Sequence, residues 1–193
     1  MTGKVISLPA PNKNLDATLM QCLQNRQSVR EFADRELSLE DLSSLLWAAN
    51  GVNREDGKRT APSALNTQDV DIYVCAAGGA YLYNAPEHQL EQVTEEDVRK
   101  LVSGRQPLSA PIFLVLVIDM SRYPAFLVNN KEVTKQFGSC DAGFVSQNIC
   151  LYCTAAGLNT APRTTMEIDE LSKALHLTES QLPVINNPVG YKK

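Results

Sequence analysis

APIFLVLVI, residues 110–118, is the stretch that decides the fold, because it is continuously apolar and rich in β-branched residues. A strand that is apolar at every position, rather than at alternate positions, has to be covered on both faces. No other apolar run in the chain is longer, and this one is far shorter than the roughly 20 residues that span a bilayer. The sequence therefore predicts a central strand with structure packed against both sides.

Helix-type and strand-type patterns alternate on either side of this strand. SLEDLSSLLWAANG predicts a helix between an N-cap at Ser38 and a stop at Gly51. A long helix with few charges is predicted over 141–157, either buried or at a subunit interface. The remaining expectations are an extended arm over 1–14, a helix over 15–25, a loop over 53–68, a strand over 71–77, a hairpin of 81–83 with 89–93, a helix from Thr94-x-x-Asp97 to about 102, a helix over 167–175 and a last strand over 182–190.

The arrangement of these elements favours the α+β class. Strands occur both as a hairpin and as isolated runs between helices, which is not the regular alternation of a doubly wound fold. No internal repeat or low-complexity tract divides the chain. We expect a single domain over residues 1–193, with a central mixed β-sheet flanked by helices.

Composition limits the function. The 193 residues include 18 Lys and Arg against 22 Asp and Glu, and 44% are hydrophobic. These are globular proportions, which exclude disordered and fibrous classes. An acidic balance without a basic cluster argues against nucleic acid or a membrane as partner. Because MTGKVISLPAPNK lacks a secretory signal pattern, we expect a cytoplasmic protein, with export after removal of a leader left open.

The five cysteines do not form a disulfide or metal framework. They are Cys22, Cys75, Cys140, Cys150 and Cys153, an odd number without dense spacing. The CxxC at 150–153 falls within a predicted helix rather than after a strand at a helix start, and the chain has only 2 histidines. We predict reduced structural thiols and no metal site.

Arg26-Gln27-Ser28-Val29-Arg30 is the first candidate binding segment, directly after the first predicted helix. Two guanidiniums with a hydroxyl between them can converge on one anion if the segment is extended. Arginine suits phosphate because its planar fork donates two parallel hydrogen bonds. The alternative is a solvated basic loop that pairs with Glu31 and Asp34.

Two further polar segments could bind a ligand. Residues 60–68 precede a strand and offer hydroxyl, amide and backbone N–H groups to the edge of a heterocycle. Residues 156–165 follow a helix end at Gly157 and expose backbone donors beside Pro162. Taken singly, these segments are better explained as an ordinary connector and a helix C-cap.

In their order along the chain, the three segments resemble the FMN-dependent nitroreductase family. The shared features are Arg-x-Ser-x-Arg, then Pro-Ser-x-x-Asn-x-Gln, then a Gly-Leu-x-Thr turn followed by proline, within Leu19 to Tyr191. The chain is most similar to short members with a Leu-Pro-x-Pro arm (8–11) and a final Val-Gly-Tyr (189–191), a group similar to the dehydrogenases that oxidise azoline rings in modified peptides. The resemblance implies a nitroreductase-like fold, FMN as cofactor, and an intertwined homodimer with flavin sites at its interface.

The resemblance also implies roles for the first two segments. Arg26 would hold the FMN phosphate with support from Ser28, and Arg30 would face the pyrimidine edge of the isoalloxazine. Residues 62–68 would reach the flavin of the other subunit.

Later parts of the chain would complete that site. Gln106 would lie near the ring, and Pro162–Thr165 would pass it with a backbone N–H at N5. Lys192 and Lys193 could replace basic phosphate ligands of longer members. The full implied cofactor site is Arg26, Gln27, Ser28, Arg30, Pro62, Ser63, Ala64, Leu65, Asn66, Gln68, Gln106, Pro162, Arg163, Thr164, Thr165, Lys192 and Lys193. No catalytic side chain is implied, because the chemistry takes place at flavin N5.

The activity implied by the resemblance is NAD(P)H-driven reduction of small electron-poor acceptors, such as nitroaromatics or quinones, by a ping-pong mechanism. The alternatives are an FMN-dependent dehydrogenase that passes electrons from a substrate to oxygen, and a flavin-binding protein without turnover. Two positions depart from longer members: Asp69-Val70 stands where Pro-Trp is frequent, and Thr164-Thr165 where Glu-Gly is common. The substrate and the choice between NADH and NADPH stay open.

Overall fold

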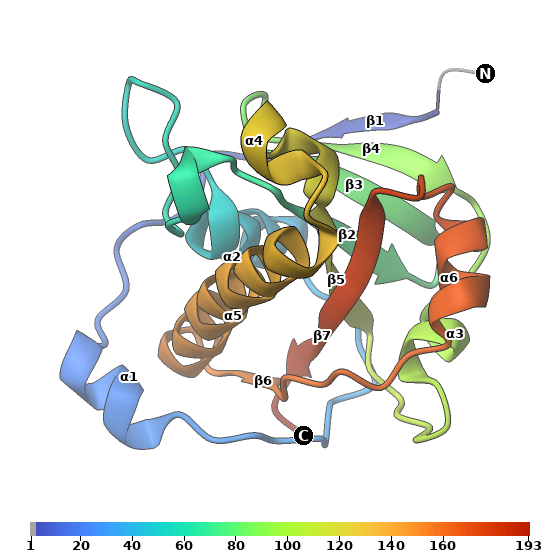
Figure 1. Cartoon of the computed structure of the whole chain (residues 1–193). Helices are drawn as coiled ribbons and strands as arrows, with labels where there is room; N and C mark the ends of the chain where they lie inside the picture. Colours follow the sequence, from blue (N-terminus) through green and yellow to red (C-terminus); the bar gives the residue numbers. More distant parts are fainter. Residues whose placement is uncertain (1–2) are drawn as a thin grey trace.

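A computed structural model describes residues 3–193, and these residues form a seven-stranded sheet with the order β1-β4-β3-β2-β5-β7-β6 (Figure 1). The strands are β1 (Val5–Ser7), β2 (Val70–Ala76), β3 (Gly79–Asn84), β4 (Gln89–Thr94), β5 (Ile112–Asp119), β6 (Leu158–Thr160) and β7 (Gln181–Tyr191). Every neighbouring pair is antiparallel, so the prediction of a mixed sheet is wrong. The isolated strands β5 and β6 do point the same way, but β7 lies between them and is antiparallel to both.

Strand β5 is covered on both faces, as predicted. Leu114 and Leu116 belong to one buried cluster with α2 (Leu39–Asn50) and α5 (Lys131–Ala155). Phe113 and Val115, whose side chains point to the opposite face, belong to a second cluster with α3 (Arg99–Ser103) and α6 (Ile168–Ala174). Figure 1 shows the sheet between these two pairs of helices. An all-apolar strand is stable here because neither face meets water.

Helix limits follow local capping chemistry. Helix α2 begins where predicted, since the Asp41 N–H donates to Ser38 Oγ at 3.1 Å. Helix α1 (Leu19–Asn25) begins later than the predicted 15–25, because Thr18 and Gln21 form a capping box. Helix α5 begins at Lys131, well before the predicted residue 141, because the side chain of Asn130 accepts the Val133 N–H at 3.3 Å.

Turn-forming side chains explain another difference. Helix α3 starts at Arg99 and not at Thr94-x-x-Asp97. The reason is that Thr94 accepts the Glu96 N–H and Asp97 accepts the Arg99 N–H, and both contacts are short-range turn contacts.

Several short elements were not predicted from the sequence. They are β1, β6, the short helix α4 (Ala125–Val128), and the 3-10 turns η1 (Ala64–Asn66) and η2 (Met120–Arg122). Within residues 3–193, no helix is long and apolar enough to cross a bilayer.

Candidate functional site

A cavity of about 330 Å³ opens where four segments that are distant in the sequence meet. Its lining residues are Arg30, Gln106, Pro162, Arg163, Thr164, Thr165 and Ile185. All of them except Ile185 of β7 were assigned to the flavin site from the sequence. We refer to this hollow as the Arg30 cavity.

Arg30 reaches the cavity because residues 26–31 run in extended form beside β6. The Val29 N–H donates to Thr160 O at 2.9 Å, and Asn159 Nδ2 donates to Glu31 O at 2.8 Å. The next residues after β6 are Pro162–Thr165, so Arg30 is brought beside them. Arg26, Gln27 and Ser28 lie outside the lining of this cavity, with Gln27 and Ser28 exposed and Arg26 half-buried at the end of α1.

The segment Pro162–Thr165 is fastened to β7 by Asn186. The Arg163 N–H donates to Asn186 O at 2.8 Å, and the Asn186 N–H donates to Arg163 O at 2.7 Å. Asn186 Nδ2 also donates to Thr165 O at 3.2 Å. The Arg163 N–H is used in this bridge. Within residues 162–165, the backbone N–H groups of Thr164 and Thr165 have no acceptor among the described residues.

The Arg163 side chain turns into the protein instead of into solvent. It is 8% exposed, and its Nη2 donates to Ser103 O and Gln106 O, both at 2.9 Å. Arg163 therefore fixes the loop that carries Gln106. Within that loop Gly104 has φ 58°, and a Cβ there would lie 3.3 Å from Met166 Cα, so glycine permits the close approach.

The two guanidiniums of the Arg30 cavity differ in exposure, because Arg30 is exposed and Arg163 is buried. Burial, together with the neighbouring Arg30 charge, lowers the pKa of Arg163, although a guanidinium still stays protonated. Nη1 of Arg163 is buried without a hydrogen-bond partner. No carboxylate among residues 3–193 lines the cavity. A buried cation without a counter-charge or full hydrogen bonding is costly, so the cavity suits an anionic or electron-rich ligand.

Residues 62–68 lie elsewhere in the protomer. Pro62, Ser63 and Gln68 line a separate small hollow that shares no residue with the Arg30 cavity. The loop is tightly wound, with φ of 55° at Leu65, 55° at Asn66 and 51° at Gln68, and Leu65 at its tip is 62% exposed. One protomer therefore does not bring this predicted group to the Arg30 cavity.

One side chain of this loop and two side chains from other elements hold it in place. The Gln68 N–H donates to Ser63 Oγ at 2.9 Å, and Arg122 Nη1 donates to Gln68 O at 2.7 Å. The Ala64 N–H donates to Asp141 Oδ2 of α5 at 2.8 Å. Sequence analysis did not single out Asp141 or Arg122 as supports, since nothing in the sequence shows that α5 passes the loop.

Lys192 and Lys193 are exposed after β7. Lys193 and Arg30 both line a larger cavity of about 970 Å³, whose apolar base includes Leu42 and Val74. Arg30 therefore lies between two hollows. Among the predicted site residues, only Arg30 and Lys193 touch the larger one.

Asn186 and Ser103 are the supports that sequence reasoning missed. The sequence did contain a pattern that points to Asn186, since two adjacent asparagines stand among the apolar residues of the last strand. The structure shows that both are fully buried. Buried amides need partners, so such a pair indicates a hydrogen-bonded site. Ser103 acts through its backbone carbonyl, for which no side-chain pattern exists.

Fold and cavity together define an α+β protein with a cationic cavity at the surface of its sheet-and-helix body. Residues 23–191 match the Nitroreductase family, so the chain belongs to that family of typically flavin-dependent oxidoreductases. The Methanocaldococcus jannaschii protein MJ1384, named as a nitroreductase, is 30% identical over 190 residues, covering 90% of this chain and 91% of that protein.

Solved structures show the same fold. A crystal structure of a Ralstonia eutropha JMP134 protein described as a nitroreductase has a TM-score of 0.88 and 34% identity, covering 98% of this chain and 90% of that one. A chain of the Escherichia coli microcin synthetase McbBCD complex with truncated pro-MccB17 has a TM-score of 0.73 and 18% identity, covering 96% and 76%. The second likeness concerns the fold alone.

Proposed function

We propose that this protein is an FMN-dependent oxidoreductase that uses NAD(P)H to reduce small electron-poor acceptors such as nitroaromatics or quinones. The observation that carries the proposal is the Arg30 cavity, where two guanidiniums meet without a carboxylate. Membership of the Nitroreductase family supports it.

The residues of the cavity fit a flavin. Arg30 contributes an exposed guanidinium, and the Thr164 and Thr165 N–H groups have no protein acceptor in residues 3–193. Arg30 and Gln106 would hold the ring edge, and Pro162–Thr165 would pass along the ring. Arg26 and Ser28 would hold the phosphate, with Lys192 and Lys193 as further basic groups.

Bound FMN would supply the redox chemistry, and the protein would bind and tune it. The positive charge of Arg30 would stabilise the reduced, more electron-rich flavin ring. Hydride transfer to the flavin would therefore be easier. The N–H groups of Thr164 or Thr165 would donate to the ring at N5. Because the cavity is open, donor and acceptor can enter in turn, as a ping-pong scheme requires.

Arg30→Ala tests this electrostatic role. We expect a lower flavin reduction potential in the folded, flavin-loaded variant, because a cation near the ring is lost. Arg105→Ala, an exposed arginine of the loop beside Gln106, is the control. An unchanged potential in Arg30→Ala would rule the role out.

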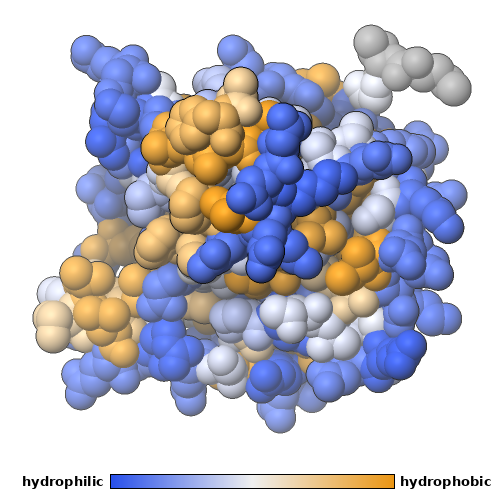
Figure 2. Space-filling model, viewed as in Figure 1, coloured by the Kyte–Doolittle hydropathy of each residue, from blue (hydrophilic) through white to orange (hydrophobic). Residues whose placement is uncertain are grey.

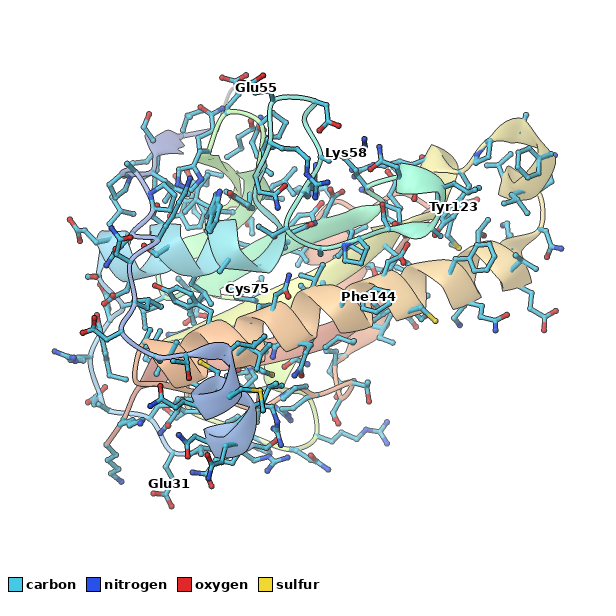
Figure 3. All side chains as sticks on the ribbon, turned by 90° about the vertical axis from the view of Figure 1, so that its left-hand side faces the viewer. Glu31, Glu55, Lys58, Cys75, Tyr123 and Phe144 are labelled. Atoms are coloured by element: carbon cyan, nitrogen blue, oxygen red, sulfur yellow. The ribbon has the colours of Figure 1, made fainter. Side chains whose placement is uncertain are left out.

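We also propose a homodimer in which residues 62–68 complete the partner's flavin site. Within one protomer the loop is separate from the Arg30 cavity and presents Leu65 to solvent. Phe144 on α5 is 49% exposed, on the face that also carries α1 and α2 (Figure 3). Apolar side chains also gather over α1, where Leu19 and Met20 are exposed (Figure 2). Such surfaces on one side of a molecule mark an interaction site.

Phe144→Glu should weaken this dimer, because burying a charge in an apolar contact is costly. Sedimentation at micromolar concentration should show a shift toward monomer. Val5→Glu, which places the same charge on an exposed strand at the sheet edge, should leave the size unchanged. A wild-type protein that is monomeric at this concentration would contradict the proposal.

An absorbance spectrum tests the proposed activity directly. A yellow protein that bleaches anaerobically with NADH or NADPH supports the reductase. A protein that stays yellow with both nucleotides would favour the dehydrogenase or the carrier without turnover, and oxygen uptake with a candidate substrate would separate these. A colourless protein that does not take up added FMN would refute the proposal.

A further inference from the structure

Two buried carboxyl groups face each other beneath the 62–68 loop. Asp69, at the end of the loop, is fully buried, and Asp141 of α5 is 3% exposed. The Asp141 carboxyl lies within hydrogen-bonding reach of Asp69. Helix α5 approaches closely at Gly138, where a Cβ would lie 2.8 Å from Asp69 Oδ2. The pair is therefore enclosed between the loop and the helix.

Each carboxyl holds one part of the loop. Asp141 Oδ2 accepts the Ala64 N–H at 2.8 Å. Asp69 Oδ1 accepts from Thr67 Oγ1, and Asp69 Oδ2 accepts from Tyr123 Oη, both at 3.1 Å. Ala64 and Thr67 lie directly before and after Leu65 and Asn66, which both have left-handed φ values. The acid pair therefore holds both ends of this turn.

Two arginines lie near Asp69, and only one of them is engaged by other carboxylates. Arg122 lies near Asp69, but its Nη2 donates to both carboxylate oxygens of Asp71, at 2.7 and 2.6 Å, and its Nε lies 3.5 Å from Asp119. Arg59, from the loop before Ala61, also lies near Asp69 and Asp71, and its Nε is buried without a hydrogen-bond partner in residues 3–193. Asp141 meets Asp69 and the Ala64 N–H, and among residues 3–193 no salt bridge reaches it.

Two enclosed carboxyls in contact cannot both be ionised without mutual repulsion. One proton between them removes the repulsion and adds a hydrogen bond. Burial raises the pKa of Asp141, and the charge of Asp69 and the hydrogen bond with it raise this pKa further. The hydrogen bond from the Ala64 N–H lowers it, and the pKa that results is about 6.

We propose that Asp141 is a positioning residue for the flavin site, which holds residues 63–67 in place when it shares one proton with Asp69 and loosens them when that proton is lost. The step from loop to flavin rests on the proposed function, in which the loop contacts the partner's cofactor.

The sign of the pH dependence follows from the raised pKa. A carboxyl whose pKa is higher in the folded protein than its ordinary 3.8 stabilises the fold fully below that ordinary value. This contribution is lost as the pH rises through about 6. The loop should therefore be held most tightly in mildly acidic solution and most loosely in alkaline solution.

Asp141→Asn is the informative variant, because asparagine resembles the protonated acid. Its amide oxygen can accept the Ala64 N–H, and its NH₂ can donate to Asp69 at every pH. Glu132→Gln removes an exposed carboxylate from the same helix and is the matched control. Asp69→Asn, which removes the charge from the other side, serves as a second variant should Asp141→Asn fail to fold.

The first readout is FMN affinity from about pH 5 to about pH 8, measured by quenching of flavin fluorescence in the full-length protein. The FMN phosphate also titrates near pH 6, so the comparison is between variants at each pH. As the pH rises from about 5 to about 8, we expect the FMN affinity of the wild type and of Glu132→Gln to fall about tenfold more than that of Asp141→Asn. A difference of about one unit between the pKa of Asp141 in the free and in the FMN-bound protein gives this factor. Identical pH profiles for Asp141→Asn and wild type would overturn the proposal.

The second readout is hydrogen exchange of the Ala64 amide in flavin-free protein. At alkaline pH the wild type should exchange faster than Asp141→Asn, and at about pH 5 the two should agree. Equal exchange at both pH values would overturn the acid pair as a support. Different exchange with parallel affinity profiles would overturn the positioning role. If no protein binds FMN, the proposed function fails, and the exchange still decides the acid pair.

Discussion

The two halves of the candidate flavin site are fastened by different chemistry. Residues 162–165 are tied to β7 by paired backbone hydrogen bonds with Asn186, and Arg163 anchors the adjacent loop from inside. Residues 62–68 are tied to the body by the carboxyl groups of Asp69 and Asp141. Amides and a guanidinium do not titrate near neutral pH, whereas a buried carboxyl pair does. The proposed site would therefore join one half without a group that titrates near neutral pH with one half held by Asp141, whose pKa is raised to about 6.

The halves also differ in backbone strain. Leu65, Asn66 and Gln68 have left-handed φ values, which cost roughly 1 kcal/mol or more for a residue with a Cβ. In the 162–165 segment no residue has a positive φ. The 62–68 loop therefore depends on its side-chain supports more than the other half does. Three substitutions test whether the two halves differ in this way.

Arg163→Met should have the largest effect. The variant leaves the carbonyls of Ser103 and Gln106 without their buried donor, which should lower the free energy of unfolding by about 2 to 4 kcal/mol. Urea denaturation measures the loss, which should be nearly the same at acidic and alkaline pH. Arg105→Met, on the exposed side of the loop, should change stability little. A loss of unfolding free energy in Arg163→Met that varies strongly with pH would contradict the claim that this half is independent of pH.

Tyr123→Phe should have an intermediate effect at the other half. It removes the hydrogen bond from Tyr123 Oη to Asp69 Oδ2, with an expected loss of about 1 kcal/mol. The loss should be greater above about pH 7 than near pH 5, because ionised Asp141 no longer donates to Asp69. Thermal melts at both pH values test this. Tyr81→Phe, whose hydroxyl meets only Gly78 O, should show no such pH difference.

Leu65→Gly should have the smallest effect. Glycine adopts φ 55° without strain but has more freedom in the unfolded chain, so we expect a gain below about 1 kcal/mol. Leu65→Ala removes nearly the same side chain and keeps the strain, so Leu65→Gly should melt at a higher temperature than Leu65→Ala. If alanine is the more stable of the two, strain at Leu65 is negligible.

Local patterns were sufficient for much of the fold. Ser38 and Gly51 define α2, the hairpin of β3 and β4 follows its alternation, and the apolar run from Ile112 shows a strand covered on both faces. Errors occurred where one side chain outweighed periodicity, as at Asn130, which starts α5 early. Such caps act over three or four residues and compete with broader patterns.

Periodicity and capping are local properties of the chain, so they predicted most of the helices and strands. The six predicted residues that line the Arg30 cavity came from the family resemblance. Only the tertiary structure decided that β7 enters between β5 and β6 and makes the sheet antiparallel. Likewise, only the folded chain shows that Arg163 supports the Gln106 loop and that Asp141 meets Asp69. These are contacts between residues many positions apart, and their energies depend on burial, which exists only after the chain has packed.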